Sequence, residues 1–209
     1  MRGIAFTAVL TAASLIGAAT AQAGVLSSSG GIITYVANQG EKNDVLVETT
    51  SLFGGSVPLY SFKDADANPI TITGSGVQPC EFFNGVAACR QEFVGSLIID
   101  VRDRDDTAQV AETVGIGALM IGGRGNDTLM GGIGGDILKG NDNRDSLRGR
   151  GGADTYKAGR GRDNLQTLDG LTDTFISCGD GNGDVVRRDR IDPKPLHCEL
   201  KNKNPSKPH

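Results

Sequence analysis

The sequence predicts an all-β fold: a parallel β-roll, or solenoid, of nine-residue repeats behind a β-rich N-terminal segment. Three observations predict it: an unbroken nine-residue period from Gly122 to Gln166, glycine-rich loops within that period, and short β-rich runs upstream. Cut every nine residues, the block reads GGRGNDTLM, GGIGGDILK, GNDNRDSLR, GRGGADTYK and AGRGRDNLQ. A unit this short and this rich in glycine disfavours helices and suits a tight loop followed by a short strand.

Two positions of the unit keep the same chemistry throughout the block. Position six is Asp in all five units, and position eight is apolar or aromatic in all five. Glycines at positions one, two and four allow positive φ in the loop, and positions seven to nine form the strand. Because side chains alternate along a strand, position eight points inward. We therefore expect a thin core of Leu129, Leu138, Leu147, Tyr156 and Leu165.

The first two units match the pattern G-G-x-G-x-D-x-U-x, in which U is an apolar residue. On these residues the block resembles the hemolysin-type, or repeats-in-toxin (RTX), calcium-binding family. The resemblance implies that two units make one turn of a β-roll and that loops eighteen residues apart lie over one another. It also implies that calcium binds between such loops, with ligands on one edge at Asp127, Asp145 and Asp163 and on the other at Asp136 and Asp154.

The number of calcium sites follows from the number of carboxylates. Calcium takes about six to eight oxygen ligands, so one loop with one dependable carboxylate does not make a site. The stacked pairs are 127 with 145, 136 with 154 and 145 with 163, so we expect about three well-formed Ca²⁺ sites. The alternative is a metal-free solenoid in which Asp and Gly only form turns, but stacked carboxylates without a cation would repel one another. Weaker candidate ligands are Asp106, Asp142, Asp173 and Asp184.

Charge and the third unit modify this expectation. Residues 122–166 carry eight Lys or Arg and six Asp, a net charge of +2, so the arginines are expected to neutralise the aspartates in part. We therefore predict that the block depends less on calcium for folding, and binds each ion more weakly, than a strongly acidic repeat block of this family. Circular dichroism in EGTA and then in calcium tests this, and complete unfolding in EGTA would contradict it. The third unit has Asn141 and Asn143 in place of glycine, and Asn tolerates a left-handed conformation. Asp142 between them is expected to face solvent.

The N-terminus is typical of a secretory signal peptide, residues 1–23. A basic start precedes an apolar run from Ile4 to Ala19 and the cleavage pattern Ala21-Gln22-Ala23, so the mature chain begins near Gly24. The apolar run is too short for a convincing membrane span. We expect an exported protein, extracellular or periplasmic.

Four cysteines in an exported chain predict two disulfides. The run Phe82–Ala87 contains Asn84-Gly85, a strong signal for a two-residue hairpin turn. Counting outward from that turn places Cys80 opposite Cys89 in a non-hydrogen-bonded pair, a separation that a disulfide can close. Cys178 and Cys198 then remain for the second bridge. The pattern from Cys178 to Glu199 resembles the disulfide-closed terminus of small exported bacterial proteins of the same family.

The domain organisation follows from these patterns. The roll, 122–166, lies between a β-rich N-terminal region, 24–121, and a stretch of degenerate repeats and disulfide cap, 167–200, after which comes a disordered basic tail, 201–209. In the N-terminal region, runs bounded by Gly, Pro, Asn and Asp predict strands at 32–37, 45–49, 59–62, 70–73, 93–101 and 107–110.

Several function classes find no support. The chain contains neither H-E-x-x-H nor G-x-S-x-G, and its two histidines are His197 and the terminal His209, so we expect no enzyme. Nucleic-acid binding is disfavoured because the chain is acidic and the repeat arginines have no aromatic partners; a basic strip of Arg148, Arg150, Arg160 and Arg162 on one face is the remaining possibility. The sequence predicts a secreted calcium-binding protein. The alternative is a calcium-rigidified adhesion, matrix or surface-interaction module with a cell-surface or polysaccharide partner.

Overall fold

The computed structural model describes residues 24–52, 57–65, 71–73, 80–83 and 86–198. The predicted signal peptide, the Asn84-Gly85 turn and the basic tail lie outside the described residues. Inside them almost all regular structure is β-strand, and the exception is a short 3-10 helix, η2 (Gln91–Phe93). No helix among these residues is long and apolar enough to cross a membrane. The predicted all-β fold is confirmed.

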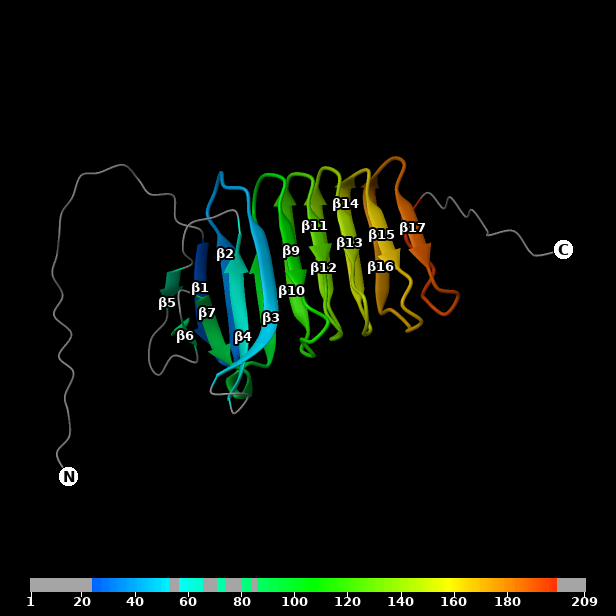
Figure 1. Ribbon diagram of the computed structural model, residues 1–209. Helices are drawn as coiled ribbons and strands as arrows, with labels where there is room; N and C mark the ends of the chain where they lie inside the picture. The colour runs from blue at the N-terminus through cyan, green and yellow to red at the C-terminus, as the bar shows by residue number, and fades with distance from the viewer. Residues whose placement is uncertain (1–23, 53–56, 66–70, 74–79, 84–85, 199–209) are drawn as a thin grey trace, which may run out of the picture.

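The repeat region forms a roll of two sheets that face each other, and within each sheet the strands of the roll run parallel. Successive strands of the chain alternate between the two sheets (Figure 1). Sheet A receives every second strand of the roll: β8 (Ser96–Asp100), β10 (Ala118–Arg124), β12 (Ile137–Asp142), β14 (Thr155–Gly161) and β16 (Phe175–Gly181). Sheet B receives the strands between them: β9 (Thr107–Val110), β11 (Thr128–Met130), β13 (Ser146–Arg148), β15 (Asn164–Thr167) and β17 (Val185–Arg188).

The two rims of the roll carry the loops. We call edge one the set of turns that lead from sheet A to sheet B, among them the turn containing Asp127, and edge two the set that lead from sheet B to sheet A, among them the turn containing Asp136. Leu129 pairs with Leu147, and Leu138 with Tyr156, so successive turns of the repeat block are stacked in the predicted register. The position-eight side chains are fully buried between the sheets, as the alternation predicts.

The roll begins before the repeat block and continues after it. β2 (Ile32–Ala37) pairs in parallel with β8, and β3 (Asp44–Leu52) with β9. The sequence-based boundary between 121 and 122 therefore falls inside strand β10. Beyond the block, β16 and β17 stack on β14 and β15, and the buried Ile176 and Val186 continue the core.

Antiparallel strands cover the N-terminal end of the roll. β1 (Gly24–Ser29) pairs with β2, and β4 (Val57–Asp64) with β3; the short β5 (Thr71–Thr73) pairs with β1. β7 (Val86–Arg90) then pairs with β4 and with β6 (Cys80–Phe83). β1 was not among the strands predicted from the sequence, and Phe93, predicted to begin a strand, is the last residue of η2.

Two disulfides hold the ends of the fold. Cys80 lies opposite Cys89 in the β6–β7 ladder and is bonded to it, with the Cα atoms 3.9 Å apart. Cys178 in β16 is bonded to Cys198, which ties the last turn to the roll. Both predicted pairings are confirmed.

The strands of sheet A are longer than the three residues that the repeat predicts. In edge one the loop backbone stays paired with its neighbour, so that Gly123 lies opposite Asn141 and Asn141 opposite Gly159. The pairing is possible because positions two and four of these loops have positive φ, including Asn141 at 78° and Asn143 at 83°. The third loop therefore survives its loss of glycine, as expected from the tolerance of Asn for this conformation.

Candidate metal centre

A ladder of aspartates runs along edge one. In each turn the Asp Oδ1 atom accepts a hydrogen bond from the backbone N–H of the equivalent residue one turn earlier. The N–H of Asp127 donates to Asp145 over 2.8 Å, and that of Asp145 donates to Asp163 over 2.9 Å. The ladder extends in both directions beyond the repeat block. Its members, in order, are Asn43, Asp106, Asp127, Asp145, Asp163 and Asp184.

Edge two carries a second ladder of the same kind. The N–H of Asp136 donates to Asp154 over 2.8 Å, and that of Asp154 donates to Asp173 over 3.1 Å. Ala118 stands at the first position of this ladder, where it contributes an N–H but no carboxylate. Asp192 ends it by accepting from the N–H of Asp173 over 3.2 Å.

The second carboxylate oxygen of most ladder residues has no partner. All the ladder aspartates are at most 5 % exposed. Among the described residues, the Oδ2 atoms of the following ladder members are buried without a hydrogen bond: Asp106, Asp127, Asp145, Asp163 and Asp184 on edge one, and Asp154 and Asp173 on edge two. A buried anionic oxygen without a donor is costly, and a bound cation is the ordinary way to satisfy it.

The glycine at position one makes room for these oxygens. A Cβ on Gly140 would lie 2.2 Å from the Oδ2 of Asp145 and 2.5 Å from the carbonyl oxygen of Ala158 in the next turn. Gly122 has the same surroundings, with the Oδ2 of Asp127 and a carbonyl oxygen of the next turn nearby. A carboxylate oxygen and a backbone carbonyl oxygen thus converge where a side chain is missing. These are the oxygen types that calcium takes, so the residues present fit the ion.

The electrostatics of the ladders are those of crowded, buried carboxyls. In seven of them burial raises the pKa above the ordinary value of 3.8, and neighbouring carboxylates of the same edge raise the pKa of several further. The backbone N–H bonded to each of these carboxyls opposes the rise. The resulting pKa is about 8 for Asp145, about 7 for Asp127, Asp154 and Asp173, and about 6 for Asp106, Asp136 and Asp163.

Asp136 differs from the other ladder residues of the repeat block. Its Oδ2 accepts a hydrogen bond from the N–H of Gly132 over 2.8 Å, so both of its oxygens are occupied by backbone donors. In the same part of edge two, the Arg150 guanidinium donates to the carbonyl oxygens of Val110 and Gly131 over 2.8 and 3.1 Å. A protein cation therefore already binds main-chain oxygens at this turn.

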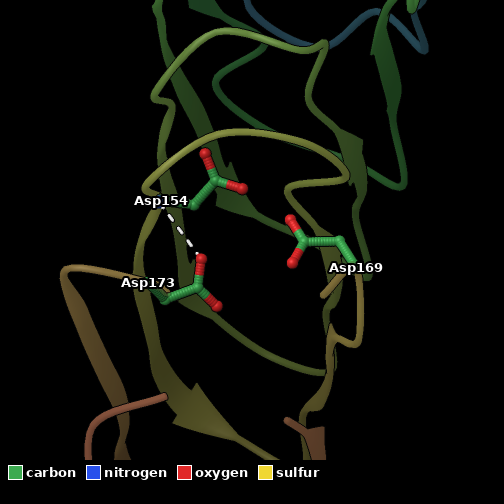
Figure 2. A group of neighbouring side chains, drawn as sticks. All are labelled: Asp154, Asp169 and Asp173. Atoms are coloured by element: carbon green, nitrogen blue, oxygen red, sulfur yellow. Dashed lines mark hydrogen bonds between the residues drawn. The ribbon is translucent and has the colours of Figure 1, made fainter. Parts of the chain in front are cut away.

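A third carboxylate joins the ladder farther along edge two. Oxygens of Asp154, Asp169 and Asp173 all lie within 4.8 Å of one another. Figure 2 shows Asp169 on the opposite side of the loop, with its carboxylate facing the other two. Asp154 and Asp173 are among the ligands predicted from the sequence, whereas Asp169 is not. The only signal was an Asp-Gly turn dipeptide in a degenerate unit, which does not distinguish a ligand from a turn residue.

Two other ladder members were not predicted from the sequence. Asn43 and Asp192 close the ladders from outside the repeat block. Asp142 lies outside the ladder, 3.8 Å from Arg160, and 43 % of its side chain is exposed, in agreement with the expectation that it faces solvent. Among the described residues the repeat arginines form ion pairs with Glu112 and Asp142, so they do not neutralise the ladder aspartates through direct ion pairs.

The basic strip, which was the remaining possibility for nucleic-acid binding, is not formed. Arg148 lies in β13 on sheet B, Arg150 inserts into edge two, and Arg160 belongs to an edge-one loop. Because Arg148 and Arg150 lie on the face of sheet B and on edge two, they share no common face with Arg160 and Arg162, which both lie on edge one.

Comparison with known proteins agrees with the geometry. Residues 119–134 and 130–165 match the family described as RTX calcium-binding nonapeptide repeat, in four copies. No curated protein and no solved structure matches the chain. The matched residues contain the central part of both aspartate ladders, and the roll extends past them at either end. Residues 119–165, with their glycine cradles and buried, unpartnered carboxylate oxygens, thus consist of RTX calcium-binding nonapeptide repeats and form the central part of a parallel β-roll.

Proposed function

We propose that the protein is an exported, non-catalytic calcium-binding protein in which Ca²⁺ bound between stacked loops stabilises the roll. The observation that carries the proposal is the row of buried Oδ2 atoms without donors. Those of Asp127, Asp145 and Asp154 lie where a Cβ would stand on the position-one glycine of the same loop. Calcium would bind the assembled turns and not the unfolded chain, so its binding free energy adds to the stability of the fold.

The two disulfides support the proposed export to an oxidising compartment. Both disulfides of the roll require oxidising conditions, as found outside the cytosol. Extracellular calcium is millimolar, and sites with Kd of order 10⁻⁴ to 10⁻³ M would be filled there. We propose edge one as the main location, with ions at the pairs Asp127–Asp145 and Asp145–Asp163.

Calorimetric titration of the purified protein with calcium tests the proposal. Asp145→Asn keeps an oxygen for the hydrogen bond from Asp127 but removes the charge shared by two proposed sites. We expect this variant to lose more calcium binding than Asp136→Asn, because both oxygens of Asp136 already have donors. Asp142→Asn, outside the ladder, is the matched control and should titrate like the wild type. The absence of calcium binding at millimolar concentration in the wild type would refute the proposal.

A second candidate function is a surface-interaction module that calcium makes rigid. The observation in its favour is the outer face of sheet A, where Ile32 and Ile137 are 39 % and 40 % exposed. The two functions are compatible. Calcium-dependent binding of the purified protein to cells or polysaccharide, lost in an Ile137→Lys variant, would support the second; calcium-dependent stability without any such binding would leave only the first.

A further inference from the structure

We propose that Asp154, Asp169 and Asp173 form a separate calcium site at the C-terminal half of edge two. Asp169 and Asp173 lie beyond residue 165, where the match to the repeat family ends, so the repeat consensus does not account for this site. The proposal rests on the proposed function only for the identity of the ion.

The spacing of the three carboxylates suits calcium. Calcium–oxygen distances are about 2.3 to 2.6 Å, so ligand oxygens on opposite sides of the ion lie about 4.6 to 5.2 Å apart. The three ligand oxygens lie within 4.8 Å of one another. For Mg²⁺ the corresponding span is about 4.0 to 4.2 Å, and that ion also prefers to keep its waters. The carboxylates come from two successive loops, so an ion between them would link two turns (Figure 2).

A second observation, independent of the clustering, points to a ligand. The side chains of Asp154 and Asp173 are 0 % and 4 % exposed, and their Oδ2 atoms have no hydrogen-bond partner among the described residues. The Oδ2 of Asp169 is also buried without a donor, while its Oδ1 accepts from the N–H of Leu171 over 2.7 Å. Each of the three residues therefore keeps one free oxygen.

The neighbouring charges do not satisfy these oxygens. The ion pairs of the described arginines and lysines involve other acids, so no basic side chain neutralises the cluster. Asp192 is already engaged, because its Oδ2 accepts from the hydroxyl of Thr167 and from the N–H of Asp189. Asp189 in turn accepts from the N–H groups of Asp169 and Gly170 and thereby fixes the loop that presents Asp169.

The contrast with the first half of edge two supports the assignment. There, Gly132 donates to the second oxygen of Asp136, and Arg150 supplies a positive charge to the carbonyl oxygens. Among the described residues, Asp154 and Asp173 have neither a backbone donor to the second carboxylate oxygen nor an inserted arginine. Instead, the carboxylate of Asp169 lies beside them. Because calcium affinity rises with the number of charged ligands, three carboxylates favour a tighter site than the two of each edge-one pair.

Terbium luminescence offers a direct test, since Tb³⁺ replaces Ca²⁺ and emits when a nearby tyrosine is excited. Tyr156 lies next to the site, because a Cβ on Gly149 would meet both the Oδ2 of Asp154 and the hydroxyl oxygen of Tyr156. Burial raises the pKa of this hydroxyl, and the charges of Asp173, Asp154 and Asp169 raise it further. We expect wild-type protein to show tyrosine-sensitised terbium emission that calcium displaces. Asp169→Asn should weaken terbium binding at this site by about tenfold or more, and Tyr156→Phe should abolish most of the emission. Asp180→Asn, an exposed aspartate in an edge-one loop, is the control and should behave like the wild type.

The outcomes separate this inference from the proposed function. Unchanged terbium emission and calcium affinity in Asp169→Asn, in a protein whose calcium binding is lowered by Asp145→Asn, would overturn the three-carboxylate site alone. The absence of calcium and terbium binding in the wild type would overturn both. Circular dichroism verifies that each variant is folded. If Asp169→Asn does not fold, the Tyr156→Phe variant provides the test. Terbium emission as strong as that of the wild type in this variant would mean that the ion binds elsewhere, and would overturn the inference.

Discussion

At the scale of single residues, the edge-one loops depend on how closely successive turns approach. A Cβ on Gly159 would lie 2.1 Å from the carbonyl oxygen of Asn141, and one on Gly161 would lie 1.8 Å from that of Asn143. In the turn before, the same two positions are occupied by Asn at φ near 80°, a left-handed conformation that Asn adopts. Gly159 has a φ of 114°, which side-chain-bearing residues rarely adopt. Glycine is therefore required here for two reasons, the backbone conformation and the lack of space for a Cβ.

We therefore expect Gly159→Ala to destabilise the roll by about 3 kcal/mol, since backbone strain and steric overlap with a neighbouring main chain add together. Gly115→Ala is the matched control, because a Cβ there has nothing within 4 Å. Urea unfolding in the presence of calcium measures both. Equal stability of the two variants would contradict the argument.

Arg150 is the other residue whose role is specific to this chain. Its guanidinium connects the carbonyl oxygens of Val110 and Gly131 from two earlier turns, and its Nε lies 3.5 Å from Glu112. Only 14 % of its side chain is exposed, so these charged hydrogen bonds are protected from water.

Replacing Arg150 by Ala should cost about 2 kcal/mol of unfolding free energy, the range for hydrogen bonds to a charged group. Because this cation belongs to the protein, we expect the same loss in EGTA and in calcium. Thermal unfolding under both conditions, with exposed Arg148→Ala as the control, provides the measurement. A loss confined to one condition would show that Arg150 acts through a bound metal.

At the scale of the elements, the sequence could predict what repeats and not what interrupts the repeat. Strict nine-residue spacing was enough to place the core at Leu129 and Leu147, the ladder at Asp127 and Asp145, and the register between them. The hairpin count likewise placed Cys80 opposite Cys89, because a two-residue turn fixes every pair outward from it.

The parts that escaped prediction depend on contacts between turns of unequal length. Asn43 is joined to Asp106 across 63 residues and Asp173 to Asp192 across 19, so a fixed period finds neither the ends of the ladders nor Asp169. The insertion of Arg150 between carbonyl oxygens, and the donor that Gly132 offers to Asp136, follow from loop geometry. A pattern of residue types predicts neither the position of the Arg150 guanidinium nor the hydrogen bond from Gly132 to Asp136.

At the scale of the whole molecule, the two ladders make the fold an array of buried acids, and this sets its response to pH. Burial raises the pKa of seven ladder carboxyls from 3.8 in the unfolded chain to between about 6 and about 8 in the fold; they are Asp106, Asp127, Asp136, Asp145, Asp154, Asp163 and Asp173. Without metal, the folded state therefore holds more protons than the unfolded state across this interval. Stability is then fully present below about pH 4 and is lost as pH rises through the folded pKa values.

Calcium reverses the trend because it binds the deprotonated carboxylates. We expect the Tm of the protein in EGTA to fall between pH 5 and pH 8, while the increase in Tm produced by calcium grows over the same interval. Scanning calorimetry at a series of pH values, with and without calcium, measures both curves. Asp145→Asn, which removes the carboxyl with the highest of these pKa values, should flatten each of them. A Tm in EGTA that rises toward pH 8 would mean that the ladder carboxylates are satisfied by the protein itself and do not require the ion.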